Sequence, residues 1–260
     1  MIFSSLCCLS LVLAGCSGGP FSSLTDGNDV PFGGSPTLDT VEYPPGASKA
    51  GFTDPSRIVN NSSVALAERS YTMRAVISST DGQRTWNRIQ YFESNPTEPA
   101  AYTLQKFPGD THEEYVNRSG RYFRCCDEDP SYGYDTPEQW SPHDVHQAGI
   151  DTSTRYLEVA LEIGEYTATD VIQREGTTLI VYNLTEPAET YDNRSITAAK
   201  GHLLVDQQGV VHGINLYVAG SRLDEPRSYT RTKLTYRVTL TESVTVEKPA
   251  WVENVTTKTA

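Results

Sequence analysis

The chain has 260 residues and a formal net charge of −12, from 33 acidic and 21 basic residues. It is long enough for one domain with a substantial core, and no basic stripe is present to neutralise phosphates, which excludes nucleic-acid binding. Arg outnumbers Lys 15 to 6, and Thr is abundant. An acidic, Lys-poor, Thr-rich surface is typical of extreme halophiles, whose proteins stay soluble at high salt. The alternative is an ordinary acidic extracellular protein.

The N-terminus combines an apolar run with the ending Leu13-Ala14-Gly15-Cys16. The run is too short to span a bilayer, and its ending matches a lipobox, in which two small residues precede an obligatory Cys. We therefore expect a signal peptide over residues 1–15 and a lipid on Cys16 that holds the chain on the extracytoplasmic face of the cell membrane. The alternative is an ordinary secretory signal with Cys16 incidental. No Lys or Arg precedes Lys49, so the true start of the signal is left open.

A tether and a single domain are expected to follow. Residues 16–46 are rich in Ser, Gly, Pro and Asp and carry too little apolar area to offset chain entropy. They are predicted to be a flexible spacer, and residues 47–256 one domain.

Within the domain, Asp54-Pro55 predicts the start of a helix that ends near Arg69. A second helix is expected from a cap at Asp151 or Ser153, after a Pro-rich acidic loop over 127–142. Alternating apolar residues and turn signals predict strands. The expected strands are 71–78, 86–92, 101–107, 112–118, 121–126, 166–174, 178–184, 201–206, 210–218 and 228–246. The sum is an α+β fold with about 9–11 antiparallel strands, strongly curved around its helices or enclosing an apolar pocket.

At this point the chain resembles a known superfamily. The strand run after an N-terminal helix, the stretch GHLLVDQQGVVHGINLYV at 201–218, and the terminal strand leading to VTVEKPAWV at 244–252 resemble the lipoprotein carriers typified by LolA, LppX and LprG. The lipobox, tether, acidic surface and Pro-x-Trp ending together resemble haloarchaeal lipoproteins of unknown function. The resemblance implies a half-barrel of antiparallel sheet with helices on the concave side and acyl chains held between them. It supplies no binding motif that maps residue by residue.

Cysteine use is sparse, with only Cys125 and Cys126 in the expected domain. These two, with His143 and His146, are weak candidates for a zinc or copper site. Adjacent cysteines diverge on a strand, so the alternative is a vicinal disulfide with two loop histidines in solvent. The run His112-Glu113-Glu114 offers an acid/base cluster or, alternatively, an exposed strand start. No nucleophile elbow, zinc-protease signature or phosphate loop occurs, so we expect neither an enzyme nor a cofactor.

Aromatic residues are the remaining functional signal. They either line a pocket for an apolar ligand or fill an ordinary β core. The candidate ligand-binding residues are Trp86, Tyr91, Tyr102, Phe123, Tyr217 and Tyr236. The function expected is a membrane-anchored binding or carrier module for a lipid or another apolar molecule, monomeric. The alternative is a structural or protein-interaction module of the cell surface without a small ligand.

Overall fold

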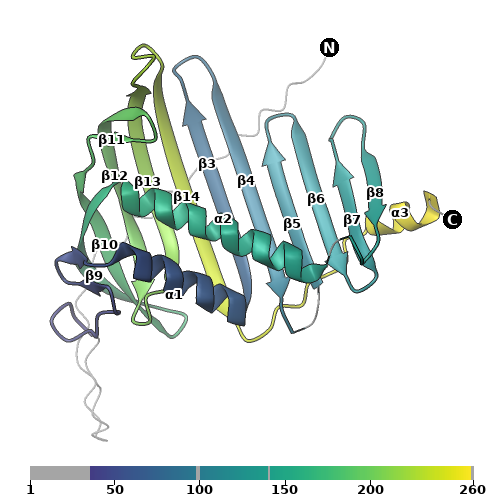
Figure 1. Ribbon diagram of the computed structural model, residues 1–260, viewed down its shortest axis with the longest axis horizontal. Coiled ribbons are helices and arrows are strands. Elements are labelled where there is room, and N and C mark those ends of the chain that lie inside the picture. The colour runs from purple at the N-terminus through teal and green to yellow at the C-terminus, as the bar shows by residue number, and fades with distance from the viewer. Residues whose placement is uncertain (1–35, 98–99, 140, 259–260) are drawn as a thin grey trace, which may run out of the picture. The chain divides into compact units, whose positions relative to one another are not determined.

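The computed structural model describes residues 36–97, 100–139 and 141–258, and the side chains among them up to residue 255. Residues 1–35, which include Cys16 and the expected signal peptide, lie outside the described part. One large antiparallel sheet dominates, with the strand order β8-β7-β6-β5-β4-β3-β14-β13-β12-β10-β9, and β11 pairs with β12 as the twelfth strand (Figure 1). Its strands are β3 (Ser70–Thr80), β4 (Thr85–Asn95), β5 (Ala100–Phe107), β6 (Asp110–Asn117), β7 (Gly120–Cys125), β8 (Ser131–Asp135), β9 (Gly164–Arg174), β10 (Thr177–Pro187), β11 (Thr190–Tyr191), β12 (Arg194–Asp206), β13 (Val211–Arg222) and β14 (Tyr229–Thr241). A small hairpin of β1 (Ala47–Ser48) and β2 (Gly51–Phe52) precedes it.

Two helices lie across the concave side of the curved sheet (Figure 1). Helix α1 (Pro55–Glu68) begins as expected, because the Asp54 side chain accepts a hydrogen bond from the Arg57 amide and Pro55 occupies the first turn. Helix α2 (Pro142–Glu162) packs against α1 and contacts strands in both halves of the sheet. The predicted fold class, an antiparallel α+β half-barrel with helices on the concave side, is therefore confirmed, with one strand more than the upper expected number.

The predicted loop over 127–142 and the predicted start of the second helix are both wrong. Residues Ser131–Asp135 form the edge strand β8, paired with β7. Helix α2 begins nine residues before the first expected cap, Asp151, because Ser141 and Asp144 form a reciprocal capping box and Pro142 fits the first helical position. Pro142 therefore marks the beginning of the helix.

The main core lies between the helices and the concave face. On β3 and β14 the inward side chains alternate with outward ones, so Met73 faces Val238 and Ala75 faces Tyr236 across the pair. The side chains of Ile58 and Leu66 from α1 and of Leu157 from α2 fill the space above them. The polar Ser62 of α1 is also buried, and its hydroxyl is bonded to the Val211 amide of the β12–β13 turn.

Part of the expected tether belongs to the folded domain. Val41 is buried in the main core, and Leu38 and Tyr43 pack against it. The Tyr43 hydroxyl also donates to the Leu38 carbonyl at 2.8 Å. The compact unit thus begins at Pro36, eleven residues before the predicted start of the domain at residue 47. Leu38, Val41 and Tyr43 therefore hold this Pro/Gly-rich stretch against the apolar core.

The C-terminal segment covers the opposite face of the sheet. The last strand ends at Thr241 rather than near residue 246, and the chain passes the end of β4, where the Asn95 side chain donates to the Val244 carbonyl. Trp251 and helix α3 (Val252–Lys258) then form a second apolar cluster with Tyr115. Helix α3 contacts β7 and β8 (Figure 1). The convex face of this half of the sheet is therefore also apolar and covered.

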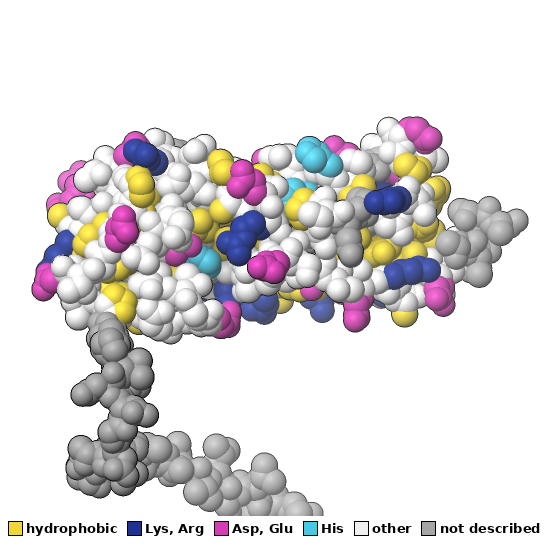
Figure 2. Space-filling view, turned by 90° about the horizontal axis from the view of Figure 1, so that it is seen from below, with side chains coloured by type: hydrophobic (Ala, Val, Ile, Leu, Met, Phe, Trp, Pro, Cys, Tyr) yellow, Lys and Arg dark blue, Asp and Glu magenta, His cyan; other side chains and the backbone are white. Residues whose placement is uncertain are grey.

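Among the described residues, no helix is both long and apolar enough to cross a bilayer. Acidic and basic side chains are interspersed on the face seen in Figure 2, where neither sign forms a continuous stripe.

Candidate apolar binding cavity

An apolar cavity of about 300 Å³ opens between α2 and the concave face. Figure 1 shows α2 crossing β3, β4, β13 and β14 there. It is lined by Ile77, Ser79, Trp86, Tyr156, Val159, Ile163, Tyr191, Asp192, Arg194, Ser195, Ile196, Leu216, Val218, Gly220, Thr230, Thr232 and Leu234. The volume lies at the lower end of the range for small-molecule sites, about 300–1,000 Å³.

Strand alternation and helix periodicity build the walls. Ile77, Leu234 and Leu216 are successive register partners across β3, β14 and β13, so they form one apolar row on the concave face. Tyr156 and Val159 are three residues apart on α2 and face that row from the same side of the helix. The same alternation of apolar residues that builds the core also lines the cavity. The cavity lies where α2 leaves part of the apolar sheet face uncovered.

A tight hairpin supplies the polar part of the mouth. Asp192 and Asn193, both with positive φ (46° and 58°), form the two-residue turn between β11 and β12. The turn brings Tyr191 and Arg194 to the cavity rim, where the Arg194 guanidinium donates to the Thr230 hydroxyl at 2.7 Å. One cation thus lies at the edge of a lining that is otherwise mostly apolar.

The lining is incompletely buried. Trp86 is 45% exposed, and Val218 and Ile196 are only half-buried although they point to the concave side. Filled cores bury such residues fully, as they do Leu203 and Tyr182 nearby. The exposed apolar surface marks an open cleft rather than a closed void.

Below the cavity, two tyrosines tie α2 to the sheet. Tyr236 of β14 is hydrogen-bonded to Ser153, and the Tyr156 hydroxyl donates to Gln90 of β4. Burial raises the pKa of both tyrosines above the ordinary value, so both hydroxyls stay protonated and able to donate. These bonds fix the helix that forms the cavity floor.

The six aromatic candidates are divided between the two faces. Trp86 lines the cavity, and Tyr236 lies on the same face but is fully buried under α2. Phe123 shares that face on β7, packed over Gly133 with Arg121 above its ring. The other three lie on the opposite face: Tyr91, Tyr102 and Tyr217.

The four weak metal candidates do not converge. Cys125 and Cys126 form a disulfide, as in the predicted alternative. The histidines differ from that alternative, because both lie at the start of α2 rather than in a loop. His143 is exposed, but His146 is buried with Nδ1 2.6 Å from the Ser94 hydroxyl. Burial lowers the pKa of His146, against the opposing effect of the Ala67 and Leu66 carbonyls of α1. This histidine is a neutral packing residue in the structure.

The run His112-Glu113-Glu114 is divided in the same way, since alternate residues face opposite sides. His112 pairs with Asp110, and Glu113 is buried on the other face, where it pairs with Arg124 and accepts from Tyr102. Its three side chains therefore do not act on one substrate.

The aliphatic lining and Arg194 were not singled out from the sequence. Val159, Ile196 and Val218 line the cavity but were not among the candidate ligand-binding residues, which were all aromatic. The dipeptide Asp192-Asn193 was the available signal for the hairpin that presents Arg194.

No protein-family model matches the sequence, and no curated protein matches it. Among solved structures, the chain is similar to LprF from Mycobacterium bovis, with 11% identity, 77% of this chain and 99% of that chain covered, and a TM-score of 0.37. It is similar to the lipoprotein LppX from Mycobacterium tuberculosis, with 13% identity, 75% and 100% covered, and a TM-score of 0.34. A LolA superfamily protein from Nitrosomonas europaea is also similar, with 9% identity, 73% and 94% covered, and a TM-score of 0.27.

The fold class is established by the strand order and the helix placement of this chain.

Proposed function

We propose that the protein is an extracytoplasmic, lipid-anchored binding or carrier module that takes an apolar ligand into the cavity between α2 and the sheet. The observation that carries the proposal is the open cavity of about 300 Å³, whose wall of half-exposed aliphatic side chains is costly to leave in water. Capture would be driven by burial of that surface, at roughly 25 cal/mol per Å² of apolar area.

The residues at the cavity mouth indicate which kind of ligand would fit. Arg194 and Thr230 lie at the rim, and the cavity behind them is lined by apolar groups such as Leu216. This arrangement fits a ligand with an apolar chain and a polar or anionic end group. The chain would enter the apolar cavity, and the end group would lie beside the Arg194 guanidinium. Asp192 at the same rim disfavours a second negative charge.

A substitution that fills the cavity tests ligand binding. Val159→Trp adds a large ring from α2 into the cavity and is expected to abolish binding of a fluorescent fatty acid and co-purification of lipid detected by mass spectrometry. Stability should change by less than about 1 kcal/mol, since the ring enters empty space rather than a packed core, where overpacking costs about 1–3 kcal/mol.

The matched control is Glu158→Trp, which places the same ring at the exposed neighbouring position of α2. It should leave probe affinity within twofold of the wild type. Equal loss of binding in both variants, or wild-type binding by Val159→Trp, would contradict the assignment of the cavity. Absence of any bound or bindable lipid in the wild type would favour the alternative, a surface interaction module.

The anchor is tested separately. Cys16→Ser removes the only thiol on which the proposed lipid is built and is expected to move the protein from the membrane fraction to the medium or soluble fraction, measured by immunoblotting. Ser17→Cys together with Cys16→Ser is the control, since a thiol shifted by one residue should not restore attachment. Continued membrane attachment of Cys16→Ser would refute lipidation there, without bearing on the cavity.

A further inference from the structure

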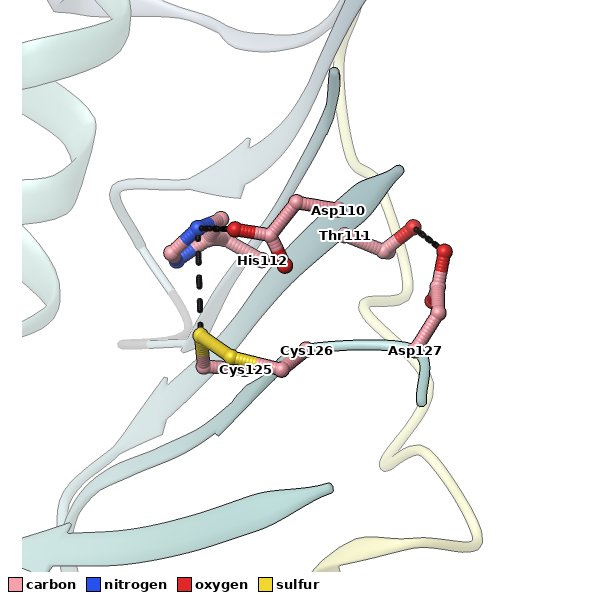
Figure 3. Close-up of a disulfide and its surroundings, with 6 residues drawn as sticks. All are labelled: Asp110, Thr111, His112, Cys125, Cys126 and Asp127. Carbon is pink, nitrogen blue, oxygen red and sulfur yellow. Dashed lines mark hydrogen bonds and ion pairs between the residues drawn. A yellow bond between two sulfur atoms is a disulfide. The ribbon is translucent and has the colours of Figure 1, made fainter. Parts of the chain in front are cut away.

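A group of metal-ligating side chains lies outside the cavity, where β6 meets β7. The carboxylate of Asp110, the imidazole of His112 and the sulfur of Cys125 have ligand atoms within 4.8 Å of one another. Figure 3 shows the three side chains turned toward each other, with the Cys125–Cys126 disulfide below the imidazole. None of them contributes to the proposed binding of an apolar ligand.

The sheet itself brings these groups together. Asp110 and His112 are two residues apart on β6 and therefore project from the same face. Cys125 is the direct register partner of His112 on β7, which places its side chain on that face too. The positions are thus held by backbone pairing, independently of the disulfide.

Adjacent cysteines normally point to opposite sides of a strand, but this pair does not. Strand β7 ends at Cys125, and Cys126 has a φ of +74°, outside the strand conformation, while its amide still donates to the Thr111 carbonyl at 3.0 Å. The turn brings its sulfur to the side of Cys125. Cys125 Sγ thus lies in the group with His112, and Cys126 Sγ is bonded directly to it.

His112 Nε2 occupies the centre of the group. It lies 2.8 Å from Asp110 Oδ2 and 3.8 Å from Cys125 Sγ, and the Phe107 ring meets the imidazole edge-on. Ligands at ordinary zinc bond lengths in a tetrahedron are separated by about 3.3–3.8 Å, from Zn–N of about 2.05 Å and Zn–S of about 2.3 Å. The Nε2–Sγ separation of 3.8 Å lies at the upper end of that range and the Nε2–Oδ2 separation of 2.8 Å lies below it, so the Asp110 carboxylate must move away from His112 to admit an ion.

We propose that reduction of the Cys125–Cys126 disulfide creates a Zn²⁺ site with both thiolates, His112 Nε2 and an Asp110 oxygen as its ligands. In the disulfide the sulfurs have no charge to offer a metal; as thiolates they are the strongest zinc ligands of the set. The site is therefore closed to zinc when oxidised and open when reduced. The His112 side chain is 45% exposed, so an ion and a reductant can reach it.

The reductant in this scheme is a dithiol. Its thiolate attacks Cys126 Sγ, the S–S bond breaks, and Cys125 leaves as a thiolate beside His112. The second thiol of the reductant then attacks the mixed disulfide, releasing Cys126 as a thiolate and leaving the reductant as its own disulfide. The protein gains two electrons, and the thiolates either take up two protons or bind Zn²⁺ in their place.

Co²⁺ and Zn²⁺ titrations of the whole protein test the proposal, before and after reduction by a phosphine that is removed anaerobically. The reduced protein is expected to bind one Co²⁺ with thiolate-to-cobalt charge-transfer absorption, displaced by one equivalent of Zn²⁺. The oxidised protein should show no such absorption and bind Zn²⁺ at least 100-fold more weakly. Equal Zn²⁺ affinity in the two redox states would overturn the proposal.

Variants separate the four-ligand site from binding by the thiols alone. In the reduced state His112→Ala and Asp110→Asn should each weaken Zn²⁺ binding at least tenfold, and Cys126→Ser should roughly halve the charge-transfer band, because the Cys125 thiolate remains. Controls are His143→Ala, at an exposed histidine, and Asp127→Asn, whose side chain is bonded to Thr111. Wild-type affinity in both His112→Ala and Asp110→Asn, with circular dichroism unchanged, would also overturn it.

Discussion

Replacing Gly149 with alanine is expected to destabilise the protein by about 2–4 kcal/mol, although alanine is the better helix former. A Cβ at this buried position of α2 would lie 2.2 Å from the Tyr71 hydroxyl oxygen and 3.1 Å from the Phe92 ring. Tyr71 is fully buried, and its hydroxyl donates to the His146 carbonyl at 2.9 Å. The methyl group must displace a fixed ring.

The opposing effects differ in size. Alanine gains about 1 kcal/mol of helix propensity over glycine. Against this, overpacking costs about 1–3 kcal/mol, and a buried hydroxyl without its partner costs about 1–3 kcal/mol more. Urea unfolding measures the net change, with Ala148→Gly, at the exposed neighbouring position, as control. Ala148→Gly should lose about 1 kcal/mol by propensity alone. A more stable Gly149→Ala variant would show that α2 does not approach β3 this closely.

Most of the sheet was predictable because strand alternation and turn residues are local signals. The inward-facing residues Met73 and Ala75 of β3 follow from its alternating pattern, and the turn between β5 and β6 follows from Pro108-Gly109. Edge strand β8 was missed although Tyr132 and Tyr134 alternate with Ser131, Gly133 and Asp135, because the strand is short, contains a glycine and lies in an acidic, Pro-rich stretch.

The cavity was predictable in kind but not in its residues. A sheet with two helices implied uncovered apolar surface, yet only the crossing position of α2 decides which side chains stay exposed. Tyr236 is under the helix and Trp86 beyond it, although both sit on the concave face of neighbouring strand pairs. Tyr217 failed as a candidate for a simpler reason, since it alternates to the other face.

The apolar cluster on the convex face could not be predicted from the sequence either. Tyr115 and Tyr102 have the strand pattern of solvent-facing aromatics, and nothing local says that the last residues of the chain return to cover them. The segment Pro249-Ala250-Trp251 lies within the predicted domain, but the sequence assigned no packing partner to Trp251. In the structure Trp251 packs against Tyr115, which leads to the second large expected effect.

Trp251→Ala is expected to cost about 3–5 kcal/mol, the usual range for deleting a buried Trp side chain. Trp251 is 8% exposed and forms a cluster with Tyr115, Val252 and Val255 on the convex face. Loss of the indole leaves Tyr115 uncovered and removes the main contact that holds α3 against the sheet. The free energy of unfolding from urea denaturation measures the cost, and limited proteolysis reports whether residues after Thr241 have become accessible.

Trp86→Ala is the matched control, because the same side chain is removed from a site that is already 45% exposed at the cavity rim. It should cost less than about 1 kcal/mol, since surface substitutions rarely exceed 0.5 kcal/mol and only part of the ring is buried. Trp251→Ala with stability equal to Trp86→Ala would mean that the C-terminal segment contributes little to the fold. Early proteolysis at that segment without global unfolding would instead give the free energy of a local opening, in which α3 leaves the sheet while the helix-covered face stays folded.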